Sequence, residues 1–324
     1  MKSRRQGTGD VSYFHLTDDF SKTRWRMSNR TIGYLFLSLA MMTVGSTVIA
    51  SKLIAGSLPP FPATALRFAV ALPFLFALVL LRGERWPSLS RRAWGLLILQ
   101  AGAGSVGYTT LLISGLAYLP AADAGVVIGT LPAVSALFSV VVLGERPKLR
   151  LMVSVLLATI GVMAVAWTGS GSASLLGVLF ILGAVICESA FILLNKRMPV
   201  PLPPLLQATA MTGLGLLVSL PVAVLDFPST APSSAAVAAV VWYALVPTVG
   251  GFLLWYAGAA RVSGSEAATF TAVAPLTAVA LAALFLHERI GATQAFGVVA
   301  VILAILTLTL SVRPLSRSLD SDLQ

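Results

Sequence analysis

Charged residues are scarce in this sequence of 324 residues. Asp, Glu, Lys and Arg make up 10% of the chain, apolar residues make up 57%, and the mean hydropathy is +0.91. Because a soluble domain carries about 25% charged residues, this composition leaves too little polar surface to cover a water-soluble globule of the same size. The sequence therefore predicts a protein that is surrounded mainly by lipid.

Cysteine and histidine are almost absent. Cys187 is the single cysteine, which excludes a disulfide framework and a cysteine-rich metal site. The two histidines, His15 and His287, are too few for a transition-metal pathway or a nucleophile–base constellation. The sequence also contains no GxxxxGK[ST] signature for ATP. We expect no metal, no cofactor and no enzymatic activity.

Acidic residues are outnumbered by basic ones, 12 to 22, which gives a net charge of +10. A basic protein can bind nucleic acid, but such a protein needs a basic face interleaved with aromatic residues. Here the basic residues form short clusters between apolar runs, the pattern that sets the topology of membrane proteins. We therefore expect a lipid bilayer as the partner and no nucleic acid.

Ten apolar runs have about the length that spans a bilayer as a helix. The runs are Thr31–Ile54, Phe61–Leu81, Ala93–Leu116, Asp123–Leu143, Leu151–Trp167, Leu175–Asn195, Leu205–Leu225, Val237–Ala259, Glu266–Leu286 and Ala292–Ser311. Nineteen of the 22 lysines and arginines lie in the tails or in connections after even-numbered runs. Because basic residues favour the cytoplasmic side, we predict an all-α protein of the cell (inner) membrane with both termini in the cytoplasm.

One stretch of the chain occurs twice. Ala121–Arg146 returns without a gap as Gly264–Arg289. The matched residues are Asp123 with Glu266, Pro132 with Pro275, Glu145 with Glu288 and Arg146 with Arg289. We expect two repeats of five helices, residues 27–170 and 171–313, between a disordered basic tail (1–26) and a C-terminal tail (314–324). Five is odd, so the second repeat must cross the membrane in the opposite direction.

Inverted repeats of this kind are typical of secondary transporters, whose binding sites lie near the middle of the membrane between the repeats. The two copies can exchange roles and so produce inward-open and outward-open states. The alternative is an old duplication inside a static scaffold or a membrane enzyme. An enzyme would need a cluster of acid and base residues at one interface, and the sequence offers none.

Several motifs resemble those of the EamA-type transporters of the drug/metabolite transporter superfamily. Each copy has a proline-bearing fourth helix that closes on GER or HER. Further matches are GSTVIASK, which ends at Lys52, LRF around Arg67, and the GVM and GVV stretches of the fifth and tenth runs. The family usually has an aromatic residue before the glycine of the first helix, where this chain has Val44. The resemblance covers residues 28–313.

The resemblance implies a secondary transporter that exports a small metabolite, amino acid-like or otherwise polar or amphipathic, by alternating access. A coupling proton is one candidate for the driving ion, and no oligomeric state follows from the sequence. A drug or toxic-compound efflux protein is the alternative within the same class. A non-transporting membrane enzyme or scaffold is the alternative from another class.

Pro132 and Pro275 are the predicted hinges. Each lies nine residues after the acid of its copy, which is about 13 Å along a helix and near the middle of a ~30 Å hydrocarbon core. A proline inside a helix frees the carbonyl four residues earlier, here that of Ile128 or Thr271. A free carbonyl at this depth is tolerated where protein or a water-filled cavity satisfies it.

The acids at the ends of the repeated stretch have mainly structural interpretations. Asp123 and Glu266 begin their helices, where an acid caps free N–H groups and favours the helix dipole. The pairs Glu145-Arg146 and Glu288-Arg289 end the same helices and are expected to fix the turn into the next span.

Three charges are predicted to lie within the membrane. Glu188 lies about 10 Å deep in the sixth run and is a functional candidate by default. It would pair a substrate amine or relay a proton, or it would hold helices together as an internally bonded acid. Lys52 and Arg67 have side chains long enough to snorkel to the interface, which we expect for both, and recognition of a carboxylate or phosphate is the alternative.

Polar and aromatic residues in the first, third, fourth, eighth and ninth runs complete the candidate site. In the family that the chain resembles, these helices and the sixth line a central cavity. The candidates are Ser46, Thr47, Gln100, Tyr108, Thr109, Thr130, Trp255, Tyr256, Thr269 and Thr271, with Glu188. A single Ser or Thr in a membrane helix often bonds only its own backbone. Glycines in the third and eighth runs, such as Gly104 and Gly251, are expected to allow close helix approach.

Overall fold

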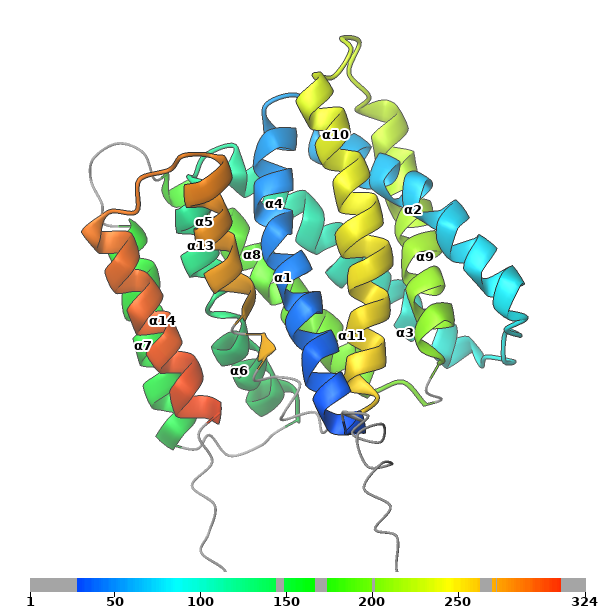
Figure 1. The fold of residues 1–324 in the computed structure, drawn as a ribbon, viewed down its shortest axis with the longest axis horizontal. Coiled ribbons are helices and arrows are strands. Elements are labelled where there is room, and N and C mark those ends of the chain that lie inside the picture. Colours follow the sequence, from blue (N-terminus) through cyan, green and yellow to red (C-terminus); the bar gives the residue numbers. More distant parts are fainter. Residues whose placement is uncertain are drawn as a thin grey trace, which may run out of the picture.

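The computed structural model describes residues 28–143, 149–166, 174–199, 202–262, 270–271 and 273–309. Within these ranges the chain forms helices joined by turns (Figure 1), and none of these residues belongs to a strand. The expected tails, 1–26 and 314–324, lie outside the described residues, as do Glu145, Arg146, Glu266 and Thr269.

The helices follow the apolar runs of the sequence. They are α1 (Asn29–Ala55), α2 (Pro60–Arg82), α3 (Arg91–Gln100), η1 (Ala101–Gly107), α4 (Tyr108–Leu116), α5 (Ala121–Ile128), α6 (Leu131–Leu143), α7 (Leu149–Ala166), α8 (Leu175–Lys196), α9 (Pro204–Leu225), α10 (Ser234–Tyr243), η2 (Ala244–Gly251), α11 (Phe252–Ala259), α13 (Val273–Phe285) and α14 (Ala292–Thr309). Six segments are long and apolar enough to cross a membrane, namely α1, α2, α3–η1–α4, α8, α9 and α10–η2–α11. The described part of the chain is therefore helical throughout, apart from its turns and connections, with the apolar spans expected of an integral membrane protein.

Helix starts are set by serine and proline. The hydroxyl groups of Ser28, Ser90, Ser174 and Ser233 each accept a hydrogen bond from a backbone N–H in the first turn of α1, α3, α8 and α10. These bonds satisfy N–H groups that have no partner inside the helix. In α2 and α9 a proline occupies the first helical turn, where its missing N–H is not needed.

Elements recur at a constant spacing along the chain. Helix α3 begins at residue 91 and α10 at 234, η1 at 101 and η2 at 244, and α7 at 149 and α14 at 292, a difference of 143 in each case. The π-helical segments η1 and η2 were not expected from the sequence. Such segments are rare and frequently mark functional sites, and here the same rare feature interrupts the corresponding helix of each copy.

Corresponding helices also pack against each other. Helices α7 and α14 form a pair at one edge of the bundle, α2 and α9 form a pair at the other, and α1 lies between them against α4, α11 and α13 (Figure 1). The start of α1 and the end of α14 lie at the same end of the bundle. The two copies are thus interleaved, and each contributes to the centre.

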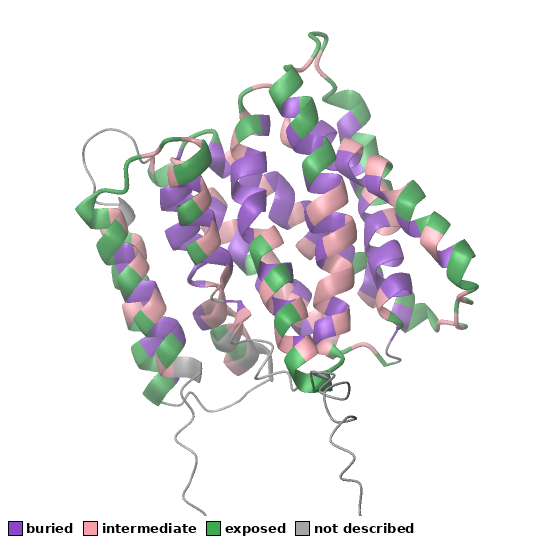
Figure 2. Cartoon of the chain, in the orientation of Figure 1, coloured by how far each residue is buried: buried purple, intermediate pink, exposed green. Residues whose placement is uncertain are grey.

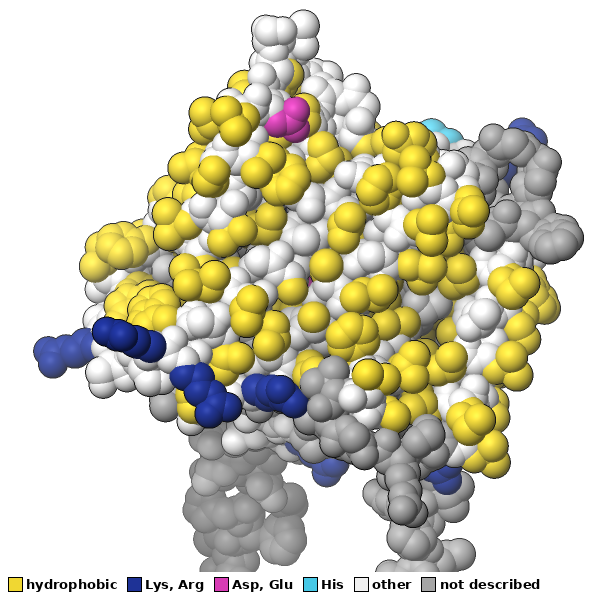
Figure 3. Space-filling view, turned by 180° about the vertical axis from the view of Figure 1, so that it is seen from behind, with side chains coloured by type: hydrophobic (Ala, Val, Ile, Leu, Met, Phe, Trp, Pro, Cys, Tyr) yellow, Lys and Arg dark blue, Asp and Glu magenta, His cyan; other side chains and the backbone are white. Residues whose placement is uncertain are grey.

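Burial separates a packed centre from an apolar outer surface. Buried residues concentrate on the inner faces of the central helices, whereas the outer faces are exposed (Figure 2). Many exposed side chains are large and apolar, among them Leu81 at 83% and Leu225 at 88% exposure. Figure 3 shows such side chains spread over one face, with Lys and Arg at its lower edge. An apolar surface of this extent is expected in contact with lipid tails.

Candidate functional site

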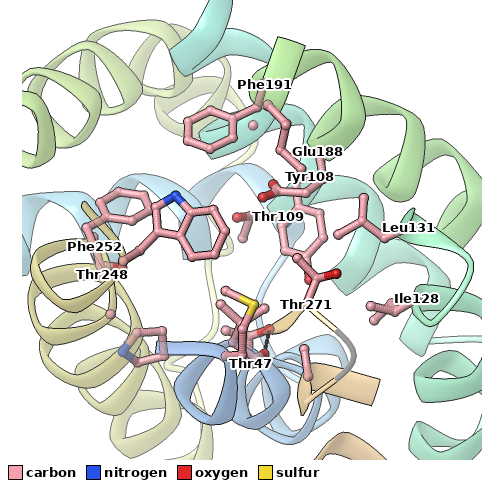
Figure 4. Close-up of a pocket in the computed structure, with 18 of the residues that line it drawn as sticks. Thr47, Tyr108, Thr109, Ile128, Leu131, Glu188, Phe191, Thr248, Phe252 and Thr271 are labelled. Atoms are coloured by element: carbon pink, nitrogen blue, oxygen red, sulfur yellow. Dashed lines mark hydrogen bonds between the residues drawn. The ribbon is translucent and has the colours of Figure 1, made fainter. Parts of the chain in front are cut away.

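A cavity lies at the centre of the bundle, between helices of both copies (Figure 4). The space between its lining atoms, including its opening, is about 960 Å³. Its charged lining residues are Arg67 and Glu188, its threonines are Thr47, Thr109, Thr248 and Thr271, and its aromatic residues are Tyr108, Phe191, Tyr243, Phe252 and Trp255. Apolar side chains such as Met41 and Val44 complete the wall, as is usual for a small-molecule site.

The structure places six of the candidates from the sequence in this wall, namely Thr47, Tyr108, Thr109, Glu188, Trp255 and Thr271. Four others do not line it, so the prediction for them is corrected. Ser46 accepts a bond from Trp242 Nε1, Gln100 donates to the carbonyl of Phe191, Thr130 donates to the carbonyl of Val127, and Tyr256 is buried in an apolar cluster. Ser46 and Gln100 are thus bonded to the neighbouring helices α10 and α8, whereas Thr130 bonds within its own segment of the chain.

Three cavity threonines bond to their own helices, as single threonines in membrane helices often do. Thr47 donates to the carbonyl of Val44, Thr109 to that of Ser105 and Thr248 to that of Tyr243, at 2.7–2.9 Å. Their hydroxyl hydrogens are therefore used within the protein. The oxygen atoms keep acceptor capacity toward the cavity.

Arg67 does not snorkel, so the favoured expectation is wrong. Its side chain is 5% exposed, because α2 turns it inward against η1 and α10. Nη2 donates to the carbonyl of Ser105 at 3.1 Å, and Cζ lies 4.2 Å and 4.3 Å from the ring centroids of Phe68 and Tyr243. Two aromatic rings and one carbonyl thus hold a permanent positive charge at the cavity wall.

Glu188 lines the same cavity from another helix. It is half-buried on α8, next to Phe191 and close to Tyr108 (Figure 4). Phe191 is three residues further along α8, so the two side chains share a helix face. Glu188 is an intramembrane acid at a cavity wall, where such residues are usually functional.

The helix that carries Pro132 is broken instead of kinked. Helix α5 ends at Ile128 and α6 begins at Leu131, so the expected continuous run is two helices. Ile128 and Thr271 both line the cavity. The carbonyl of Thr271 is not free as predicted, because it accepts the N–H of Ala274 at 3.3 Å. The first copy therefore interrupts its fourth helix at the cavity wall, just before its proline, and in the second copy α13 begins at Val273, two residues before Pro275.

Asp123 does not cap its helix, which corrects another expectation. The residue at the cap position of α5 is Pro120, and the first N–H groups of α5 donate instead to the carboxylate of Glu288 in the other copy. Its Oε1 accepts the N–H of Ala121 at 2.9 Å and its Oε2 that of Ala122 at 2.8 Å. Asp123 itself is fully buried with Gln294 near its carboxyl group, and neither of its oxygens makes a hydrogen bond of good geometry within the described part of the chain.

The turn formed by His287, Glu288 and Arg289 places the carboxylate of Glu288 at the start of α5. His287 has a φ of +53°, and the N–H of Glu288 bonds to the carbonyl of Ala282 in the last turn of α13. A left-handed residue at this place is a common way to end a helix. In the sequence the first copy has Gly144 at the corresponding position, the residue type that adopts such angles most readily. The predicted structural role of Glu288 is therefore a capping role between the two copies.

Lys52 lies away from the cavity. Its Nζ donates to the carbonyls of Leu116 and Leu119, at 2.8 Å and 2.6 Å, and its side chain is half-buried. These carbonyls lie at and beyond the end of α4, where helix carbonyls lack internal partners. Lys52 thus connects the end of α1 to the end of α4, instead of reaching the interface alone.

Four aromatic and polar residues of the wall were missed by sequence reasoning, namely Phe191, Tyr243, Thr248 and Phe252. Helical spacing was the available signal for two of them. Phe191 is three residues after Glu188, and Phe252 is three residues before Trp255, so each shares a face with a residue that was chosen.

Comparisons with known proteins agree with this architecture. The chain is 31% identical over 277 residues to the uncharacterized transporter YetK of Bacillus subtilis, covering 83% of this chain and 84% of the relative. It is 25% identical to the uncharacterized transporter YdeK of the same organism, covering 82% and 92%. A solved crystal structure of a protein with 23% identity shares the fold, with a TM-score of 0.61 over 88% of this chain and 99% of the other.

The model of the EamA-like transporter family matches residues 31–167 and 175–310. The match occurs twice, and together the two segments cover nearly all of the helical chain. This chain therefore belongs to the EamA-like transporter family and is a multi-pass membrane transporter.

Proposed function

We propose that the protein is a secondary transporter that exports a small polar or amphipathic metabolite across the cell (inner) membrane by alternating access. The observation that carries this proposal is the central cavity, which both copies line and which holds a buried arginine and a glutamate. In this proposal residues 27–170 and 171–313 are two inverted repeats of five spans each, and both termini are cytoplasmic. The chain acts as a carrier, not as an enzyme.

Irregular helices at the cavity wall support movement of the two copies. Gly104 belongs to η1 and Gly251 to η2, and both line the cavity, as does Ile128 beside the break between α5 and α6. Such irregular backbone inside a membrane is tolerated where it is buried or lines a cavity. Pro132 follows this break, Pro275 is its match in the second copy, and both remain the proposed hinges.

The aromatic wall also suits an apolar drug-like compound, which is the second candidate function. Tyr108, Phe191, Phe252 and Trp255 offer ring faces to such a ligand. A drug efflux protein would move many unrelated apolar compounds, whereas a metabolite carrier would move one chemical class. The same transport screen separates these functions, and it also separates both from a non-transporting scaffold.

The screen uses the purified full-length protein in proteoliposomes. Uptake and efflux of metabolite pools and of apolar cationic drugs are measured with and without a proton gradient, because a proton is the candidate coupling ion. We expect one class of metabolite to move faster than in protein-free vesicles, and the Pro132→Ala/Pro275→Ala double variant to move it more slowly although it binds it equally well. If no compound moves faster than in empty vesicles, the transport proposal is wrong.

A further inference from the structure

The cavity holds two opposite charges in an otherwise apolar wall. Arg67 on α2 and Glu188 on α8 are its charged residues within the described chain. Aromatic and aliphatic side chains surround both of them. Placing charges in such surroundings costs free energy unless partners compensate them. Packing alone therefore does not explain why Arg67 and Glu188 are present in this wall.

The guanidinium of Arg67 keeps open donors. One N–H group bonds to the carbonyl of Ser105, and the rings of Phe68 and Tyr243 pack against the guanidinium carbon. Within the described residues Nε has no hydrogen-bond partner, although the side chain is 95% buried. A guanidinium has five N–H donors in a planar fork that matches a carboxylate or phosphate.

Tyr108 provides another open polar group near both charges. Its side chain is 8% exposed, and its hydroxyl, which lies near the side chain of Thr47, makes no hydrogen bond of good geometry within the described residues. Both Glu188 and Arg67 lie close enough to interact with it electrostatically. Buried polar groups are normally bonded, so an unpartnered hydroxyl beside an unpartnered Nε at a cavity wall indicates space for a polar ligand.

The charges of Arg67 and Glu188 determine which charged groups that ligand must carry. A simple anion at Arg67 would leave Glu188 without a partner, and a simple cation at Glu188 would leave Arg67 without one. A zwitterion satisfies both residues and carries no net charge into the membrane interior. The aromatic wall formed by Phe191, Phe252 and Trp255 would then receive an apolar substituent.

We propose that this cavity binds an amphipathic zwitterion, whose oxyanion group (carboxylate or phosphate) lies at Arg67 and whose ammonium group lies at Glu188. The proposal rests on the transport function proposed above and specifies the substrate class of the same site. Tyr108 lies near both groups and donates a hydrogen bond to the bound solute.

Ligand binding to the purified full-length protein tests this assignment. The probes share one phenyl group, namely phenylalanine, its aminophosphonate analogue, phenethylamine and 3-phenylpropionate, and calorimetry measures their Kd. Each zwitterion has one more charged group bound by the protein than a singly charged probe has, so the better zwitterion should bind at least ~10-fold more tightly than either singly charged probe. The preference between the carboxylate and the phosphonate identifies the oxyanion.

Two substitutions test which charged group of the ligand each residue binds. Arg67→Gln should abolish the advantage of the zwitterion over phenethylamine, and Glu188→Gln should abolish its advantage over 3-phenylpropionate. The matched controls are Arg82→Gln, at the exposed end of the same helix α2, and Asp226→Asn, at the exposed end of α9, and both should leave all Kd values unchanged. If a cavity variant does not fold, the order of the Kd values of the probes for the wild-type protein tests the proposal.

Equal binding of zwitterions and singly charged probes would overturn the proposal, as would no binding of any probe. An unchanged ranking in folded Arg67→Gln and Glu188→Gln proteins would also overturn it. The transport function is tested separately by the proteoliposome screen. Movement of some other class of compound in that screen would leave the transporter intact while the zwitterion assignment fails.

Discussion

Replacing Glu288 with alanine is expected to lower the free energy of unfolding by about 2–6 kcal/mol, since two buried N–H donors lose their acceptors at about 1–3 kcal/mol each. The donors belong to Ala121 and Ala122, which are 0% and 2% exposed. Water therefore does not replace the carboxylate easily. Because Glu288 follows α13 and the donors begin α5, the substitution also removes a contact between the two copies of the repeat.

Thermal unfolding in detergent measures this effect. Glu288→Gln keeps one side-chain acceptor and should unfold between the wild type and Glu288→Ala. Asp226→Ala removes an exposed acid at the end of α9 and should leave the unfolding temperature unchanged. A Glu288→Ala protein that unfolds at the wild-type temperature would show that the cap between the copies does not contribute to stability.

Replacing Gly104 with alanine is expected to stop most transport. A Cβ atom at Gly104 would lie 2.5 Å from Cβ and Cγ of Phe191 on α8. Those atoms are close to the backbone of α8, so the helix itself must move away from η1. Overpacking of this kind typically costs about 1–3 kcal/mol, and here it displaces the helix that carries Glu188.

Gly102→Ala is the matched control for this prediction. Gly102 lies two residues earlier in the same π-helical segment, and a Cβ there meets nothing within 4 Å. We expect Gly102→Ala to transport at the wild-type rate and Gly104→Ala to lose at least ~10-fold in rate, which corresponds to 1.4 kcal/mol or more. Equal rates for the two variants, measured in proteoliposomes with equal protein content, would contradict a tight contact between η1 and α8.

The apolar runs of the sequence predicted where helices lie, because run length and composition act locally. Their ends differ by a few residues where a cap decides. The eighth run was expected to begin at Val237, but α10 begins at Ser234 because Ser233 accepts a bond from Ala236 N–H. The repeat was visible because its two copies match without a gap from Ala121 to Arg146.

Contacts between distant segments were not predictable in the same way. Asp123 has the residue type and position of a cap, but Glu288, far away in the sequence, reaches the same N–H groups. Arg67 is long enough to snorkel, but aromatic rings from its own helix and from α10 hold it inside. Both outcomes depend on which helices become neighbours, and neither local propensity nor hydropathy contains that information.

Accessibility of the cavity from both sides of the membrane tests the central claim most directly. Cys187 is the single cysteine, so Cys187→Ser provides a background in which Thr47→Cys reports on the cavity alone. Asp226→Cys and Arg85→Cys, which lie in exposed connections on opposite sides in the proposed topology, control for the sidedness of the vesicles.

A membrane-impermeant maleimide is added to right-side-out and to inside-out vesicles. We predict that Thr47→Cys reacts in both preparations and that its reaction blocks transport, whereas each control reacts in only one. Reaction of Thr47→Cys from one side only, with transport intact, would contradict an alternating-access cavity at the centre of this protein.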